Sequence, residues 1–188
     1  MKLKDLKNGD IIATCGTSFL ARQIQKFMRI YAKKTYGFEP GVLYNHTMTV
    51  ISTTRGNILV AEAIGKGFVV RPIEQALNWD VFENDPAVIR PVYPFSSVEL
   101  YRMRKQYLKF AHGNIDYEVT NFIWWVLYIL SNKKIDLSPR DNEKKLFCFE
   151  TSALLWNAAR TGFWEYPSKT TTVDMINSRY THVRILEY

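Results

Sequence analysis

Cysteine is scarce in this chain of 188 residues, which contains only Cys15 and Cys148. Two cysteines are too few for the disulfide framework of a small secreted scaffold and too few for a four-cysteine zinc module. A single disulfide between them stays open. The three histidines, His46, His112 and His182, are far apart in sequence and form no HxxxH pair. We therefore expect no structural metal and no other cofactor.

Long apolar segments are also missing. The longest apolar run, 122–130, has nine residues, whereas a membrane-spanning helix needs roughly 20. The N-terminus carries alternating charges in place of the apolar core of a signal peptide. The sequence therefore predicts no transmembrane segment and no classical secretion, which leaves a cytoplasmic protein or one carried by another assembly. The compartment itself stays open.

The charge balance is basic, with a formal net charge of +7, and 47% of the residues are hydrophobic. These values predict a single domain over 1–188, because no repeat, low-complexity tract or linker divides the chain. Basic residues favour contact with an anionic surface. They are scattered over several expected elements and match no recognisable module, so we expect no specific nucleic-acid partner.

The order of apolar patterns predicts an α+β domain with an antiparallel sheet packed against helices. Ser18 is the expected N-cap of a first helix, Ser96 and Glu99 form a capping box for a second that ends at Gly113, and a third runs from about Cys148 to Arg160. A short helix is expected within 74–84. Strands are expected at 11–13, 46–51, 57–62, 68–71, 87–90 and 181–186.

Cys148 is the better candidate for chemistry of the two cysteines. It lies at the expected start of the third helix, where unpaired backbone N–H groups stabilise a thiolate and a developing oxyanion. A nearby imidazole would then be needed to move the proton. The alternative is that Cys148 is simply a small hydrophobic core residue.

The expected hairpin offers an imidazole and a carboxylate. His46 begins one strand, and Glu62 is the single charged residue in the apolar partner segment 58–64. Pairing centred near residue 55 would place His46 diagonal to Glu62 on one face of the sheet, and a shift by one residue would separate them. If they meet, Glu62 would orient the imidazole. Otherwise His46 is a polar strand-end residue and Glu62 an edge carboxylate.

Taken in order, several short motifs resemble the circularly permuted papain-like hydrolases, which are YaeF/YiiX-type relatives of the NlpC cell-wall peptidases and of lecithin:retinol acyltransferase. The motifs span nearly the whole chain, and only the ordered set is specific. They are Asn8-Gly9-Asp10-Ile11-Ile12, a Gly/Ser loop, Asn45-His46-Thr47-Met48-Thr49-Val50, Val60-Ala61-Glu62-Ala63, Ile115-Asp116-Tyr117 and Phe147-Cys148-Phe149-Glu150.

The resemblance implies a permuted papain-like (NlpC-type) fold, with a sheet or small barrel against helices and the nucleophile at a helix N-terminus. It implies Cys148 as nucleophile, His46 as general base and Glu62 as the group that orients the histidine. The implied activity is that of a hydrolase or acyltransferase acting on an amide or ester bond of a small-molecule, peptide or lipid-like substrate. Implied substrate contacts are Cys15, Gly16, Ser18, Tyr117 and Phe149.

Two features depart from this pattern. The family usually has serine after the nucleophile, whereas this chain has the bulky Phe149, so a catalytically inactive papain-like domain that serves as a binding or structural module is the alternative. The aromatic segment with Phe122, Trp124, Trp125 and Tyr128 suits either core packing or an apolar lid.

Cys15 could compete as a nucleophile or pair with Cys148 under oxidation.

Overall fold

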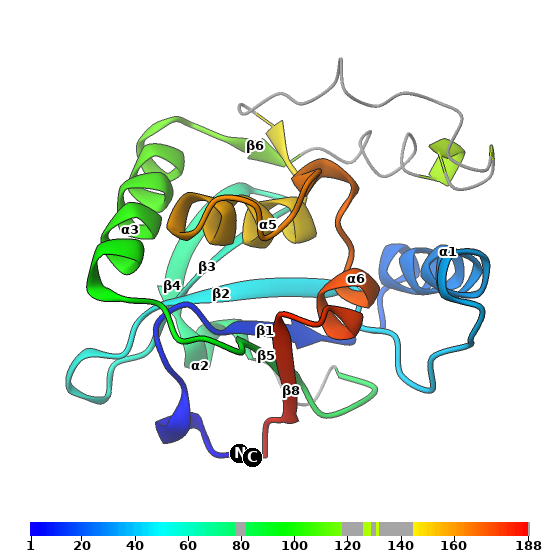
Figure 1. Cartoon of the computed structure of the whole chain (residues 1–188), viewed down its shortest axis with the longest axis horizontal. Coiled ribbons are helices and arrows are strands. Elements are labelled where there is room, and N and C mark those ends of the chain that lie inside the picture. The colour runs from blue at the N-terminus through cyan, green and yellow to red at the C-terminus, as the bar shows by residue number, and fades with distance from the viewer. Residues whose placement is uncertain (78–81, 118–125, 129–130, 132–144, 188) are drawn as a thin grey trace.

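A six-stranded antiparallel sheet organises the protein, seen in a computed structural model that describes residues 1–77, 82–117, 126–128, 131 and 145–187 (Figure 1). The strand order is β4-β3-β2-β1-β5-β8. A separate parallel pair joins β6 (Asp116–Tyr117) to β7 (Lys145–Leu146). The bounds of the six strands are β1 Ile11–Thr14, β2 His46–Ser52, β3 Leu59–Ile64, β4 Gly67–Pro72, β5 Ala87–Pro91 and β8 Thr181–Ile185.

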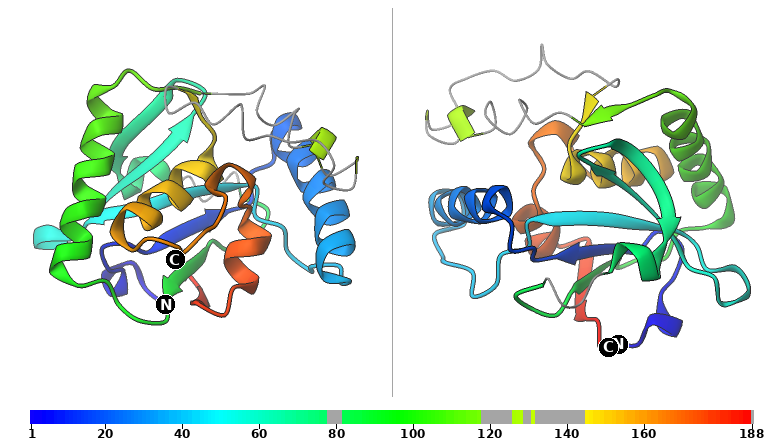
Figure 2. Two further views of the ribbon diagram at one scale, coloured as in Figure 1. Left: turned by 45° about the horizontal axis from the view of Figure 1, so that its top comes forward. Right: turned by 180° about the vertical axis from the view of Figure 1, so that it is seen from behind.

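Helices cover both faces and one end of the sheet. Figure 2 shows α3 and α5 on one face, α2 on the opposite face, and α1 beside the end where β1 ends and β2 begins. None of the helices in the described ranges is both long and apolar enough to cross a membrane. Their bounds are α1 Phe19–Tyr36, α2 Ile73–Ala76, α3 Ser97–His112, α5 Cys148–Ala159 and α6 Thr172–Asn177, with 3₁₀ turns at Leu3–Asp5, Thr54–Gly56 and Pro167–Lys169.

The central strand β1 is buried on both faces. Ile11 belongs to the cluster beneath α3 and α5, and Ile12 belongs to the cluster on the opposite face with Ile73 of α2. This alternation follows from side chains that point to opposite faces at successive strand positions. It explains why β1 appears in the sequence as a continuous apolar run and not as an alternating one.

The helix α5 is the central helix that its apolar sequence predicts. Trp156 is fully buried, and its Nε1 donates to the carbonyl oxygen of Gly9 at 2.7 Å. Its ring makes edge contacts with Phe95 and Phe163, with centroids 5.5 and 4.8 Å away. This one side chain therefore connects α5 to the turn before β1. It also contacts the segment before α3, through Phe95, and the segment after α5, through Phe163.

Several predicted helix ends are confirmed. The Ser18 Oγ accepts a hydrogen bond from the Ala21 amide at 3.2 Å, and Ser96 and Glu99 form the capping box at the start of α3. The helix expected within 74–84 is limited to α2 in the described residues. Sequence patterns did not predict α6, β6, β7 or the 3₁₀ turns, which are too short to show a clear period.

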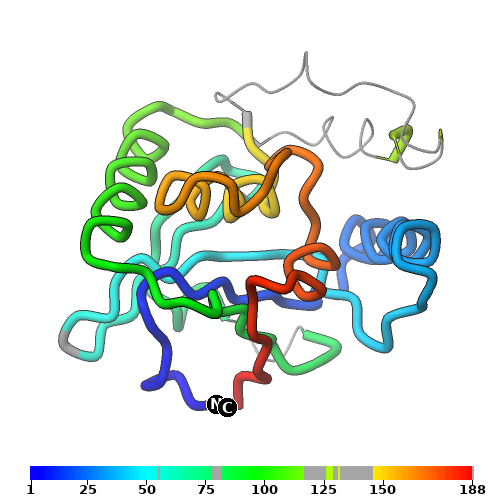
Figure 3. The backbone as a smooth tube through the Cα atoms, viewed as in Figure 1, coloured from blue at the N-terminus to red at the C-terminus, as the bar shows by residue number. Residues whose placement is uncertain are grey.

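The two chain ends lie side by side (Figure 3). The N-terminal ammonium of Met1 donates to the Ile185 carbonyl oxygen at 2.9 Å, and the Glu187 amide donates to the Met1 carbonyl oxygen at 2.8 Å. Residues that are 184 positions apart are therefore hydrogen-bonded directly.

Gly67 offers a test of how β4 begins. It has φ +100°, and a Cβ there would lie 2.3 Å from the Ile115 carbonyl oxygen. That oxygen accepts from the Phe68 amide, so it has little freedom to move. We expect Gly67→Ala to lower the free energy of unfolding by about 2 kcal/mol in urea denaturation. Gly65 in the same turn has no atom within 4 Å of an added Cβ, so an equal loss in Gly65→Ala would contradict this explanation.

Candidate active site

The hairpin brings His46 and Glu62 together. Thr49 pairs with Ala61 and Val50 with Val60, so the pairing is centred on residue 55, with an irregularity beyond Val50. The Nε2 of His46 lies 2.6 Å from Oε2 of Glu62. Of the alternatives that the sequence left open, the observed register is the one that brings the imidazole and the carboxylate together.

Glu62 is a buried carboxylate held between two cations. It is 1% exposed, and its second oxygen, Oε1, accepts from Nε of Arg71 at 2.5 Å. Burial by itself raises the pKa of Glu62, but hydrogen bonds and charge from His46 and Arg71 lower it below the ordinary value. Arg71 also donates through Nη1 to the Gln75 carbonyl oxygen at 2.9 Å. Glu62 is therefore ionised and fixed in orientation.

Arg71 was missed in the sequence. The strand that carries Arg71 is predicted from the sequence, but Arg71 is not identified there as a partner of Glu62. The two residues are diagonal to each other on neighbouring strands, and not directly paired. In the structure Arg71 pairs in register with Val60, two residues before Glu62. A basic residue on a third strand, diagonal to the acidic one on its neighbour, is the signal that could have found it.

Cys148 is the first residue of α5 and lies beside His46. Its carbonyl oxygen accepts from Thr47 Oγ1 at 2.9 Å, which ties the start of the helix to the strand position next to His46. Desolvation lowers the pKa of His46, but electrostatic interaction and hydrogen bonding with Cys148 and with Glu62 raise it to about 10. Because Glu62 takes Nε2, the ring nitrogen left for the sulfur is Nδ1.

Glu150 caps the helix. Its Oε2 accepts from the Phe147 amide at 3.3 Å, which fits the role of a first-turn residue favoured by the helix dipole. Backbone N–H groups at the start of a helix have no intrahelical acceptor. The Glu150 carboxylate accepts from one of them, the N–H of Phe147, which directly precedes Cys148. The start of α5 thus combines a thiol with the N–H groups that stabilise negative charge.

A pocket of about 310 Å³ is lined by His46 and Glu62. Gly16 and Ser18 line it, as the resemblance implies for substrate contacts. Arg71 adds a cation to its wall. The remaining lining is mostly small or apolar and includes Leu20, Ala21, Ile24, Met48, Ala63, Ile64, Ala76 and Phe82.

Of the other expected contact residues, Cys15 and Phe149 do not line this pocket. Phe149 is 3% exposed and packs edge-on against Phe147, with ring centroids 5.2 Å apart, in a cluster with α1. The bulky residue after Cys148 is thus accommodated in the core. Tyr117 lies in β6, and its side chain is outside the described residues. The same holds for Phe122, Trp124 and Trp125 of the aromatic segment.

Cys15 has a different environment from Cys148. It is 1% exposed, and its sulfur accepts from Gln25 Nε2 at 2.8 Å and lies 3.7 Å from Glu83 Oε2. Burial is the main cause that raises the pKa of this thiol. Both cysteines are free, so they do not form the disulfide left open by the sequence.

His46, Glu62 and Cys148 belong to residue types that ligate metals. Within the described part of the chain, no three His, Cys, Asp or Glu side chains are grouped to hold a metal ion. Both oxygens of Glu62 are engaged, one by His46 and the other by Arg71. The residues around His46 therefore do not fit a metal centre.

Comparisons with known proteins identify a shared fold. No protein-family model and no curated protein matches the sequence. The chain is similar to a crystal structure described as metalloprotein yiiX from Escherichia coli O157:H7, DUF1105, with a TM-score of 0.61 and 13% sequence identity. The match covers 97% of this chain and 98% of that one. At this identity the likeness shows the fold alone: this is an α+β protein of YiiX-like fold.

Proposed function

We propose that this protein is a cysteine-dependent hydrolase or acyltransferase with a permuted papain-like site, acting on an amide or ester carbonyl. One observation carries the proposal: the His46 imidazole lies between the Glu62 carboxylate and the Cys148 thiol at the first residue of α5. The order of roles matches a nucleophile, a base and an orienting carboxylate.

The reaction begins with proton transfer from the Cys148 sulfur to Nδ1 of His46. The raised pKa of His46 favours the resulting imidazolium, which is paired with Glu62. The thiolate attacks the carbonyl carbon, and N–H groups at the start of α5 stabilise the oxyanion. The imidazolium then gives its proton to the leaving amine or alkoxide as the bond to the carbonyl carbon breaks. A thioester on Cys148 is the product of this half.

The second half returns the enzyme to its starting state. His46 removes a proton from water or another acceptor, and the acceptor attacks the thioester carbon. Water gives a carboxylic acid, and an alcohol or amine gives a transferred acyl group. The thiolate leaves and takes back the proton. Glu62 stays ionised throughout, because Arg71 and His46 both stabilise its charge.

A second candidate is a papain-like domain that binds a partner without catalysis. It is favoured by the burial of Cys148, which is 1% exposed, because a nucleophile must reach its substrate. Cys15 is equally buried at 1% and lacks an imidazole neighbour in the described structure. The two thiols therefore form a matched pair within one protein.

Competitive alkylation separates these candidates. Iodoacetamide is applied over a series of pH values, and mass spectrometry follows each cysteine. We expect Cys148 to react faster than Cys15 at each pH, because His46 lies beside its sulfur and takes the proton of the thiol. Cys15, whose pKa is raised by burial, should lose reactivity about tenfold per pH unit as the pH falls. In His46→Ala, Cys148 should follow the same decline.

The same experiment can also contradict the proposal. If Cys148 and Cys15 react at similar rates with the same pH dependence, and His46→Ala changes neither, the proposed nucleophile is contradicted and the binding domain is favoured. Circular dichroism of each variant shows whether the fold is intact. An unfolded reference, alkylated in urea, gives the rate of a fully accessible thiol.

A further inference from the structure

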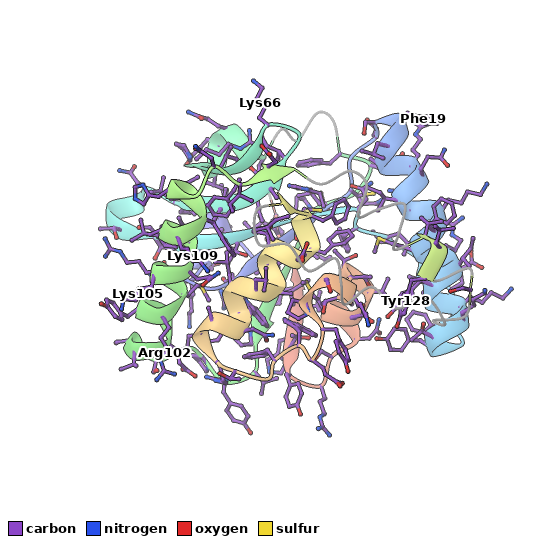
Figure 4. The ribbon with its side chains drawn as sticks, turned by 90° about the horizontal axis from the view of Figure 1, so that it is seen from above. Phe19, Lys66, Arg102, Lys105, Lys109 and Tyr128 are labelled. Atoms are coloured by element: carbon purple, nitrogen blue, oxygen red, sulfur yellow. The ribbon has the colours of Figure 1, made fainter. Side chains whose placement is uncertain are left out.

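The outer side of α3 carries a basic surface that plays no part in the proposed site. We propose that this surface docks on an anionic phospholipid membrane. We define the outer α3 face as the exposed residues at helical spacing, Val98, Tyr101, Arg102, Lys105, Leu108 and Lys109. Figure 4 shows Arg102, Lys105 and Lys109 following one another along α3.

The positive charge of the outer α3 face is not neutralised from within the helix. Glu99 is the single acidic residue of α3. Its oxygen Oε1 accepts from Arg160 Nε at 2.5 Å on the side that faces α5. In the described part of the chain, no ion pair involves Arg102 or Lys105. The phosphates of a membrane surface would supply the missing negative charge.

Apolar side chains are interleaved with these cations. Val98 is 60% exposed, Tyr101 58% and Leu108 38%. Lys105 also lies over the Tyr101 ring, with its Nζ 5.4 Å from the centroid. A basic helix face with aliphatic and aromatic side chains between its charges suits the interface of a bilayer, where the apolar groups enter the headgroup region. A nucleic-acid backbone would leave Val98 and Leu108 without an apolar partner.

A hollow beside this face strengthens the choice of a phosphate-bearing partner. It has a volume of about 500 Å³ and lies between α3 and the β2–β3 hairpin. Arg104 and the phenols Tyr101 and Tyr107 line it, together with Thr54 and Asn8. A guanidinium among hydroxyl and amide groups is a suitable setting for one lipid headgroup at the edge of the docked surface.

The other basic helix, α1, provides a matched control. Its Arg22 pairs with Glu83 at 3.8 Å and its Arg29 with Glu39 at 3.1 Å. Acidic groups from neighbouring loops thus offset part of its charge. Lys26 and Lys33 of α1 are exposed, and α1 and α3 lie at opposite sides of the molecule (Figure 1). Replacing Lys26 and Lys33 therefore changes the net charge by the same amount as replacing Arg102 and Lys105, but on a different face of the molecule.

Vesicle co-sedimentation of the full chain tests the proposal. Vesicles of phosphatidylcholine with about 30% phosphatidylserine are compared with phosphatidylcholine alone. We expect binding to the anionic vesicles only, and loss of binding between about 0.1 M and about 1 M ionic strength. Arg102→Glu with Lys105→Glu should weaken partition by at least about tenfold. Lys26→Glu with Lys33→Glu should weaken it far less.

Each other outcome overturns the proposal. Equal binding to neutral vesicles would remove the electrostatic basis. Equal weakening by the α1 and α3 variants would show attraction by net charge without a docking face. Binding of a DNA or RNA duplex that depends on α3, without vesicle binding, would assign the face to nucleic acid. The neutral pair Arg102→Gln and Lys105→Gln repeats the test without introducing repulsion, and circular dichroism shows that each variant is folded.

Discussion

Replacing Cys148 by alanine should lower turnover of a p-nitrophenyl ester by about 10³-fold or more, to near the rate without protein. His46→Ala should cause a loss of similar size, because the thiol then has no base. The double variant should be no slower than either single variant, since residues that act as one unit are not additive. Initial rates measured by absorbance, with protein concentration varied, give the comparison.

Cys15→Ala is the control for this experiment. Cys15 has the same exposure as Cys148 and a sulfur held by Gln25, so the variant removes a buried thiol without touching the proposed machinery. It should keep most of the wild-type rate. Turnover that survives in Cys148→Ala, or that falls equally in Cys15→Ala, would contradict the role of Cys148. If the role of Cys148 is confirmed, peptide and lipid amides tested in the same format identify the substrate class.

Replacing Trp156 by alanine should lower the free energy of unfolding by about 3–5 kcal/mol. The indole is fully buried at the centre of α5, and the substitution removes its ring contacts, leaves a cavity, and strips the Gly9 carbonyl oxygen of its donor. Trp156→Phe keeps most of the volume and loses the hydrogen bond, so we expect a smaller loss of about 1–3 kcal/mol. Urea denaturation followed by circular dichroism measures both.

Leu154 is the matched position on the same helix. It is half-buried, and we expect Leu154→Ala to cost clearly less than Trp156→Ala. If the two variants lose equal stability, the central position assigned to the indole is wrong. If Trp156→Phe is as damaging as Trp156→Ala, the hydrogen bond to Gly9 matters more than the packing of the ring.

The sequence predicts the site best where its geometry depends on local pairing. The turn between two β-rich runs predicts the hairpin, and a centre near residue 55 is the register that places His46 against Glu62. The start of α5 follows likewise from an apolar pattern that begins at Cys148. The fold class also follows, because long strands and helices show clear periods.

Other features of the site depend on contacts that no local pattern contains. The contact between Cys148 and His46 joins residues about a hundred positions apart, as does the hydrogen bond from Thr47 to the Cys148 carbonyl oxygen. Arg71 reaches Glu62 only after a third strand has joined the sheet. The packing of Phe149 into a cluster with α1 is of the same kind. Such long-range contacts are the part that sequence periodicity does not encode.

The hydrogen-bonded chain ends have a further consequence for the order of the site residues. Because Met1 and Ile185 are already in contact, a short linker could join the ends, and the chain could be opened in the exposed segment at Tyr93 and Pro94. In the rearranged chain α3, α5 and β8 would come before β1, β2 and β3, so that Cys148 would precede His46. Two different orders of the residues along the chain can thus form the same three-dimensional site. The chemistry of the site depends on how the residues are arranged in space.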